Sequence, residues 1–275
     1  MPVYLPSSGT LSTKLVSVFP GNAALGAPSR QALIAVFDCE TGTPLAVMHG
    51  EVVTAMRTAA GSALAARILA RAEADVLTIV GTGVQARAHA YAILRIRKIR
   101  EIRVAGRNSE RARALAAELE REVGALARAF DSIEASVAGA AVVCAPTHSV
   151  DPVIRGAWLE PRTHVNSVRL NPRGRELDEE GVKKSLVVVE SRQSALAPAP
   201  AGANGLLWAI RDGLISKDHV HAEVGELISG AMPGRTSQDQ ITVYKSVGVA
   251  VQDAVAANLV LKAARERGSG TEVEW

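Results

Sequence analysis

The chain has 275 residues, of which 48% are hydrophobic and 21% are charged, and its formal net charge is +3. This balance is that of a globular protein and excludes a disordered or collagen-like chain, and the length predicts two domains. Only 3% of the residues are aromatic, which argues against a base-stacking surface for nucleic acid. With no basic-then-apolar leader and no 18-residue apolar run, we expect a soluble, cytoplasmic protein that binds neither nucleic acid nor membrane.

Short apolar runs bounded by turn residues occupy the first fifty positions. Residues 14–19, 31–37 and 44–48 have this pattern, and each is followed by turn residues or by a change of pattern. Such runs predict strands, here of a small sheet with three or four strands that is antiparallel. Residues 51–72 are rich in alanine with apolar residues at helical spacing, which predicts one long helix.

Strands then alternate with helices. Apolar runs predict strands at residues 76–80, 102–105, 141–145, 164–168 and 186–190, and the intervening residues 85–94 and 109–123 have helical patterns. This alternation is typical of βαβ units and a parallel sheet. Residues 205–228 have an interrupted helical pattern, and residues 247–267 predict a closing helix.

A glycine-rich turn follows the first strand of this series. Gly81-Thr82-Gly83-Val84-Gln85-Ala86 fits the G-x-G-x-x-G/A fingerprint between a strand and a helix. The first glycine permits the tight turn, the second lets a pyrophosphate approach the backbone, and the helix start favours its negative charge. We therefore predict dinucleotide binding by Gly81, Gly83, Val84 and Gln85. The alternative is a tight turn without a ligand.

The end of the next strand indicates which dinucleotide binds. Enzymes that use NAD usually carry an acidic residue there, which accepts a hydrogen bond from the ribose. This chain has Gly106-Arg107-Asn108-Ser109 instead. Arg107, with Asn108 and Arg111 nearby, suits a 2′-phosphate, so we predict NADP, with NAD as the other possibility. The alternative is a surface arginine in front of a helix capped by Ser109.

Several blocks, in order along the whole chain, resemble the ornithine cyclodeaminase/mu-crystallin family. They are Thr13 to Asn22, Thr41 to Met48, Thr54 to Ala60, the glycine turn, Arg175 to Asp178, Val224 to Leu227, and Gly234 to Gly248. The resemblance implies a Rossmann-type doubly wound parallel sheet at 59–244. It also implies a smaller α+β dimerisation and substrate domain made of 1–58 with 245–275, and a homodimer. Family activities are ornithine cyclodeamination, ketimine reduction and oxidation of alanine or related amino acids, each with a nicotinamide cofactor.

The same resemblance implies site residues. Lys14 and Arg57 match the contacts of the family with the substrate carboxylate, and a cationic pair suits an amino or imino acid. The alternative is that neither binds a ligand: Lys14 would then be an exposed lysine of a strand, and Arg57 an arginine at the start of a helix. Thr58, expected in a first helical turn, matches a cofactor contact or a helix cap. Ser167 and Val168 end a strand where the nicotinamide half of the cofactor is expected.

Two departures from the family pattern bear on the reaction. Cyclodeaminases carry an aspartate two positions before the proline that follows this strand, and Leu170 stands there, two before Pro172. Leucine cannot exchange protons, which favours reduction of a preformed cyclic imine of the pyrroline-2-carboxylate type. In addition, the printed start resembles the middle of the substrate domain, so we expect that a segment with a helix, a strand and another arginine is missing.

The alternatives to a reductase are an ornithine cyclodeaminase, an amino-acid dehydrogenase, and a protein that binds NADPH without turnover. We predict no metal site. His219 and His221 lie close to Glu223 in sequence, but no further ligand converges on them, which favours a solvated loop. Cys39 and Cys144 exclude a disulfide framework, and we expect Cys144 to pack in a buried strand.

Overall fold

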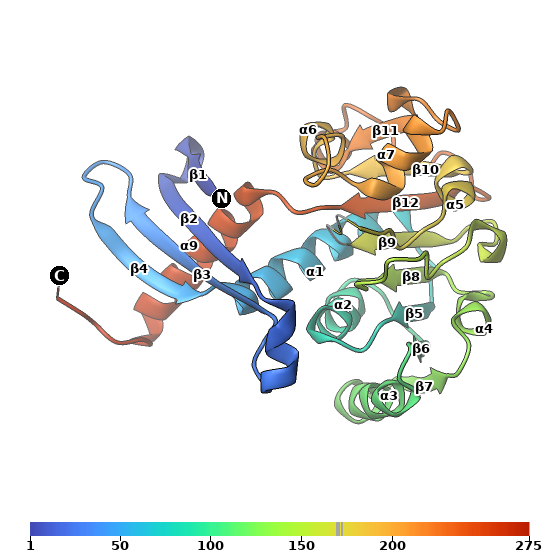
Figure 1. Cartoon of the computed structure of the whole chain (residues 1–275), viewed down its shortest axis with the longest axis horizontal. Coiled ribbons are helices and arrows are strands. Elements are labelled where there is room, and N and C mark those ends of the chain that lie inside the picture. Colours follow the sequence, from blue (N-terminus) through green and yellow to red (C-terminus); the bar gives the residue numbers. More distant parts are fainter. Residues whose placement is uncertain (169–170, 172, 275) are drawn as a thin grey trace. The chain divides into compact units, whose positions relative to one another are not determined.

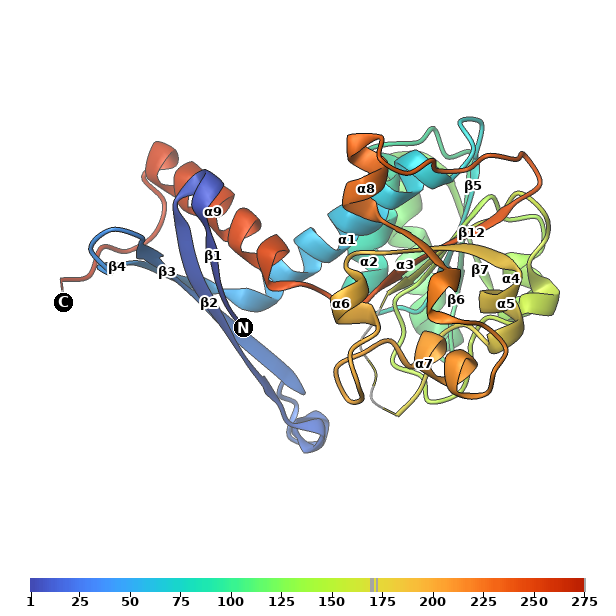
Figure 2. The ribbon, with the colours of Figure 1, turned by 90° about the horizontal axis from the view of Figure 1, so that it is seen from above.

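The computed structural model describes residues 1–168, 171 and 173–274. Two compact units are present: Met1–Arg57 with Val249–Trp275 (unit 1), and Thr58–Gly248 (unit 2). Figures 1 and 2 show an antiparallel sheet with one long helix in unit 1, and a larger sheet with helices on both faces in unit 2. The predicted α/β fold with a smaller second sheet is confirmed.

Unit 1 is built on a four-stranded antiparallel sheet in the order β1-β2-β3-β4. The strands are β1 (Pro2–Leu5), β2 (Thr10–Val18), β3 (Arg30–Asp38) and β4 (Pro44–His49), with short 3-10 helices η1 (Pro6–Ser8) and η2 (Pro20–Leu25) between them. Because successive side chains point to opposite faces, one face buries Ile34 and Val36 against Ala257 of α9 (Ala250–Arg267). The three strands predicted here are confirmed, and β1 is additional.

The long helix α1 (Gly50–Leu69) starts directly after β4. Gly50 is required there because a Cβ atom would lie 2.9 Å from the backbone carbon and the Cβ of Ala32. By length and composition α1 passes as a membrane span, but 56% of its most apolar 18-residue stretch is buried inside the protein. A core helix passes the same test, so this feature is weak evidence for a membrane span.

Unit 2 contains an eight-stranded sheet in the order β11-β10-β12-β9-β8-β5-β6-β7, in which the described pairings are parallel. The strands are β5 (Val76–Val80), β6 (Glu101–Ala105), β7 (Leu126–Phe130), β8 (Val142–Ala145), β9 (His164–Val168), β10 (Ser185–Val189), β11 (Val220–Glu223) and β12 (Ile241–Ser246). Strand β5 lies between β6 and β8, and the strands that follow it in the chain are added first on one side of it and then on the other. Ligands of open α/β sheets bind at the point where the strand order reverses in this way.

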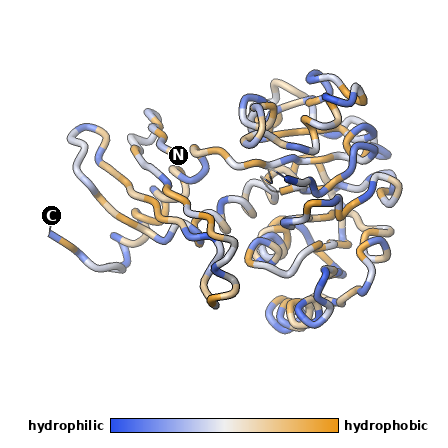
Figure 3. Tube along the Cα trace, viewed as in Figure 1, coloured by the Kyte–Doolittle hydropathy of each residue, from blue (hydrophilic) through white to orange (hydrophobic). Residues whose placement is uncertain are grey.

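Helices cover both faces of this sheet (Figure 1), and hydrophobic residues are frequent along its strands (Figure 3), as is typical of strands buried on both sides. Leu77 and Ile79 of β5 pack with α2 (Val84–Leu94) and α3 (Ser109–Val123). Val76 and Val80, on the opposite face, share a core with the other helical layer. That layer includes α4 (Ile133–Val137), η3 (Gly156–Trp158), α5 (Glu179–Lys183), α6 (Arg192–Ala195) and α7 (Asn204–Arg211).

The region 205–228 differs from its helical prediction. It contains α7, η4 (Lys217–His219), strand β11 and α8 (Val224–Ser229). A strand of four residues between two short helices leaves no clear period in the sequence, because neither pattern repeats often enough. Strands β7 and β12 are likewise additional to the predicted ones.

Candidate functional site

The glycine turn of unit 2 has the geometry of a phosphate cradle. Gly81 has a φ of +120°, a conformation that side chains rarely adopt, and its N–H donates to the carbonyl of Ala105 at 2.8 Å. Gly83 is the N-cap of α2 and has no side-chain cap, and a Cβ there would meet nothing within 4 Å. Gly83 therefore keeps open space beside the start of a helix.

The first turn of α2 supplies donors for a phosphate. Intrahelical bonding begins with the N–H of Arg87, which donates to the carbonyl of Gly83 at 3.1 Å, so earlier N–H groups have no acceptor inside the helix. Val84 is exposed and Gln85 half-buried, and among the described residues no partner bonds the buried Oε1 of Gln85. An open glycine, N–H groups without an acceptor inside the helix, and the helix dipole together fit a dinucleotide pyrophosphate.

The strand end beside this turn carries the basic residues. A Cβ on Gly106 would lie 3.3 Å from Cγ2 of Thr82, so the turn packs closely on the end of β6. Asn108, not Ser109, is the N-cap of α3, and its side chain accepts from the N–H of Arg111 at 2.8 Å. The side chains of Arg107 and Arg111 are exposed, and within the described ranges no ion pair involves either. Both guanidinium groups are free to bind an anion.

Unit 1 brings Lys14 and Arg57 together on one buried carboxylate. The Nζ of Lys14 donates to Oδ2 of Asp253 at 2.5 Å, and the Nε of Arg57 donates to Oδ1 at 3.0 Å. The three side chains are 1%, 8% and 3% exposed in the order Lys14, Arg57, Asp253. Arg57 also donates to Oε1 of Gln252 at 2.9 Å. The exposed-lysine alternative for Lys14 is therefore wrong, because burial and an ion pair hold it.

Burial lowers the pKa of Lys14 from its ordinary value, and the hydrogen bond to Asp253 opposes this change. Arg57 and Thr58 lie in the interior of α1, which begins at Gly50. Neither is at a helix start, so Thr58 cannot be an N-cap; it is 8% exposed. The predicted position in a first helical turn is wrong because α1 extends back to β4.

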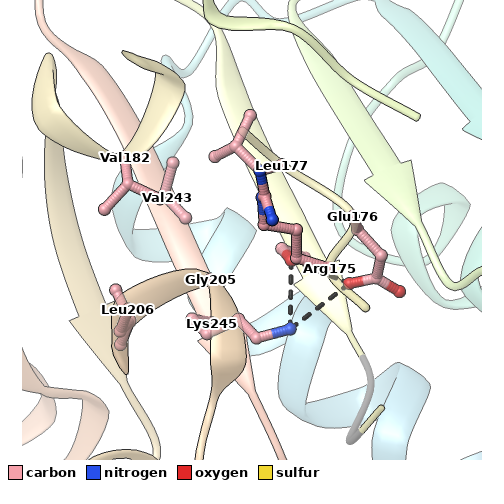
Figure 4. A pocket seen from close by; sticks show the side chains of 9 residues that line it. Arg175, Glu176, Leu177, Val182, Gly205, Leu206, Val243 and Lys245 are labelled. Carbon is pink, nitrogen blue, oxygen red and sulfur yellow. Dashed lines mark hydrogen bonds and ion pairs between the residues drawn. The ribbon is translucent and has the colours of Figure 1, made fainter. Parts of the chain in front are cut away.

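Glu176 and Lys245 form a buried polar pair (Figure 4). Ser167, next to last in β9, bonds to both of them. Its hydroxyl donates to Oε2 of Glu176 at 2.7 Å and accepts from Nζ of Lys245 at 3.2 Å. The other oxygen of Glu176 accepts from the N–H of Thr147 at 3.1 Å. Desolvation raises the pKa of Glu176. Ser167, Glu176 and Lys245 line a small pocket whose wall also includes Leu206 and Val243. Val168, next in sequence to Ser167, is buried at 3% exposure.

Sequence reasoning missed Glu176, Lys245 and Glu190 as residues that shape the ends of the strands. The hydroxyl of Ser246 and the N–H groups of Val247 and Gly248 donate to the carboxylate of Glu190 at 2.8, 3.1 and 2.7 Å. This carboxylate fixes the chain where β12 ends. For Glu190 and Lys245 the available signal was a charged residue directly after, or near the end of, an apolar strand; Glu176, which lies in a loop, gave no such signal.

The histidines His219 and His221 and the cysteine Cys144 make contacts within the fold. His219 and His221 bond to the carbonyls of Val182 and Pro233 at 2.9 and 2.8 Å, and no group of three metal-ligating side chains occurs among the described residues. Cys144 is buried in the core, and burial raises its pKa to about 12. Leu170 and Pro172, which carry the argument against cyclodeaminase chemistry, lie outside the described residues.

Comparison with known proteins places this geometry in a family. The chain is 38% identical over 261 residues to the ketimine reductase mu-crystallin of Mus musculus, covering 94% of this chain and 78% of the mouse protein. A solved Delta(1)-pyrroline-2-carboxylate reductase of Thermococcus litoralis, in complex with NADH and L-proline, has a TM-score of 0.95 at 37% identity. The match covers 99% of this chain and 84% of the chain of that reductase.

An archaeal alanine dehydrogenase dimer with bound NAD has a TM-score of 0.91 at 31% identity, and the match covers 100% of this chain and 83% of that one. The family model described as ornithine cyclodeaminase/mu-crystallin matches residues 1–268. The chain therefore belongs to the ornithine cyclodeaminase/mu-crystallin family.

Proposed function

We propose that this chain reduces the C=N bond of a small cyclic 2-imino acid, of the pyrroline-2-carboxylate type, with a nicotinamide cofactor. The observation that carries the proposal is the buried cationic pair Lys14 and Arg57, present in a chain that also has an open glycine turn. Its relatives include a ketimine reductase and a pyrroline-2-carboxylate reductase. A carboxylate-binding pair and a dinucleotide turn are the two parts that such a reaction requires.

Different residues bind the substrate and the cofactor. Arg57 and Lys14 hold the substrate carboxylate, Arg57 through its planar guanidinium and Lys14 as a point charge. Gly81, Gly83 and the start of α2 hold the pyrophosphate. When bound, the reduced cofactor supplies a hydride to the imine carbon. The C=N electron pair then moves to nitrogen, and because the nitrogen of a protonated imine already carries its proton, the reduction needs no acid at position 170.

We propose NADPH as the preferred cofactor. Arg107 and Arg111 are exposed beside the end of β6, and residues 106–109 contain no carboxylate that would repel a 2′-phosphate. A charge-assisted hydrogen bond contributes ~1.5–3 kcal/mol, so Arg107→Ala is expected to weaken NADPH binding about ten- to a hundred-fold and to leave NADH binding unchanged. Arg121→Ala, at the other end of α3, is the matched control. Equal affinity of the parent protein for NADH and NADPH contradicts this preference.

We also propose a homodimer. The face of the unit 1 sheet opposite to α9 exposes Leu15, Leu33 and Val47 at 58%, 40% and 59%, and the register places Leu15 directly opposite Leu33. Exposed apolar faces of this kind are common at interfaces between subunits. The archaeal alanine dehydrogenase relative is a dimer, which supports the same arrangement here.

The deciding experiment is cofactor oxidation with pyrroline-2-carboxylate and piperideine-2-carboxylate, measured with NADPH and with NADH. Arg57→Lys is expected to raise KM at least tenfold because the bidentate contact is lost, whereas Arg67→Lys on the same helix has no such effect. Cofactor reduction with alanine alone would assign a dehydrogenase. Tight cofactor binding without turnover of any imino acid would assign a binding protein and contradict the proposal.

A further inference from the structure

Asp253 is a buried carboxylate shared between two cations. It lies on α9 with 2% of the residue exposed, and each of its two oxygens accepts from a different residue, Lys14 or Arg57. Lys14 is 239 positions away in sequence and Arg57 is 196 positions away. A charge buried to this degree requires partners, and here the partners are the two residues assigned above to the substrate carboxylate.

We propose that Asp253 is the positioning residue of the substrate-carboxylate site: it holds Lys14 and Arg57 at a fixed separation and sets the charge of the site. This inference rests on the proposed function, which assigns the substrate carboxylate to these two cations. The neutral neighbours complete the positioning, because Thr54 accepts from Nζ of Lys14 at 3.5 Å and Gln252 accepts from Nη1 of Arg57 at 2.9 Å.

The charge of the cluster matches one carboxylate. Two cations and one carboxylate sum to +1, so the carboxylate group of one bound substrate balances the charge of these three residues. Without Asp253 the two cations would repel each other in a buried setting, and the lysine is the one that can lose its proton, since arginine stays charged. Neutral Lys14 would leave a single cation at the site.

The charged groups around Lys14 come from three elements and from the amino terminus. Burial lowers the pKa of Lys14 most, Asp253 of α9 raises it, and Arg57 of α1 and Arg30 of β3 lower it further. The Met1 ammonium donates to the backbone oxygen of Lys14 at 3.0 Å. Asp253 is therefore the group that keeps Lys14 protonated as pH rises, and its removal is expected to lower the pKa of Lys14 further.

The test compares Asp253→Asn with the parent protein over a range of pH. We expect KM for the imino acid to rise at least tenfold and the alkaline limb of kcat/KM to move to lower pH by at least one pH unit. The Kd for NADPH should not change. A KM increase with an unmoved alkaline limb would mean that Asp253 has only a packing role, and would overturn the proposal.

A second readout does not depend on turnover. NMR titration of lysine side-chain resonances, with Lys14→Arg for assignment, reports the pKa of Lys14 directly. Asp253→Asn should lower it, and the neutral control Gln252→Ala should not. An unchanged Lys14 titration in Asp253→Asn overturns the inference about Asp253, whereas failure of the parent protein to reduce any imino acid overturns only the proposed function. If Asp253→Asn does not fold, Asp253→Glu should keep the Lys14 titration and still raise KM; normal KM would contradict the positioning role.

Discussion

The Nζ of Lys245 lies 3.3 Å from Oε2 of Glu176, and both side chains are less than 10% exposed inside unit 2. Ser167 bonds to both members of the pair. An isolated buried charge is far less stable than a paired one, so these residues depend on each other for the fold of the strand ends that they occupy.

The first prediction concerns this pair. Lys245→Met leaves Glu176 buried without its cation, and we expect a loss of ~3–5 kcal/mol in the free energy of unfolding. The double variant Lys245→Met/Glu176→Gln removes both charges and should recover much of that loss. Urea unfolding of the single and double variants measures both values. A double variant less stable than Lys245→Met alone would contradict the argument.

The positions of Glu176 and Lys245 show where sequence reasoning ends. Strands β5 and β9 and helix α3 were predicted with the bounds that the structure has, because each combines a full period with clear turn or cap residues. The Glu176–Lys245 pair joins residues 69 positions apart, and no local pattern reports such a contact. Only the register between β9 and β12 brings Lys245 opposite Ser167.

The site was predictable to the same extent. The glycine turn is a local motif, and its φ and open space follow from the residue types. Lys14 and Arg57 could be selected through the family resemblance, but the carboxylate that joins them comes from the far end of the chain. Asp253 stands in a helix whose sequence shows an ordinary acidic residue in the first turn, and burial alone distinguishes it.

The second prediction separates the two glycines of the turn. Gly83→Ala introduces a Cβ into open space, so folding should be unaffected while the pyrophosphate loses room; we expect Kd for NADPH to rise at least tenfold with an unchanged melting temperature. Gly81→Ala places a Cβ on a residue with a positive φ, where alanine is strained, and should lower the melting temperature. Gly225→Ala, which also meets nothing within 4 Å, is the control for Gly83. Unchanged NADPH affinity in Gly83→Ala would refute the phosphate cradle.

The third prediction is a loss of stability in acid. Burial lowers the pKa of His164 to about 3 and that of His89 to about 4, whereas histidine in an unfolded chain has a pKa of ~6.5. The unfolded state therefore binds more protons below that pH, and the stability contributed by each neutral histidine is complete above pH ~6.5 and declines as pH falls toward the folded value.

Each histidine should contribute a slope of up to ~1.4 kcal/mol per pH unit in this window. Urea unfolding at several pH values between about 7.5 and 5 measures it. His89 donates from Nδ1 to the carbonyl of Gln85 and accepts from Ser62 at Nε2, so it is held neutral. His89→Gln should reduce the slope of unfolding free energy against pH by the contribution of one histidine. An unchanged slope would show that His89 does not titrate in this window.

The fourth prediction concerns assembly. Leu33→Glu places a charge on the exposed apolar face of the unit 1 sheet and should convert the proposed dimer into monomers at micromolar concentration. Leu126→Glu, on β7 with 39% exposure against 40% for Leu33, is the matched control and should remain dimeric. Sedimentation velocity distinguishes the two states. A parent protein that is already monomeric would contradict the homodimer.

The fifth prediction concerns Leu170. Cyclodeamination needs a group that exchanges protons with the substrate amine, and by the family resemblance the position of that group is occupied here by leucine. The parent protein should therefore release no ammonia from ornithine while it reduces a preformed cyclic imine. Leu170→Asp should give only partial gain, because a carboxyl group without hydrogen-bond partners has its pKa raised wherever it is desolvated. Ornithine turnover by the parent at ~1 s⁻¹, an ordinary enzymatic rate, would show that another residue supplies the acid–base chemistry, and the preference for a reductase would then be wrong.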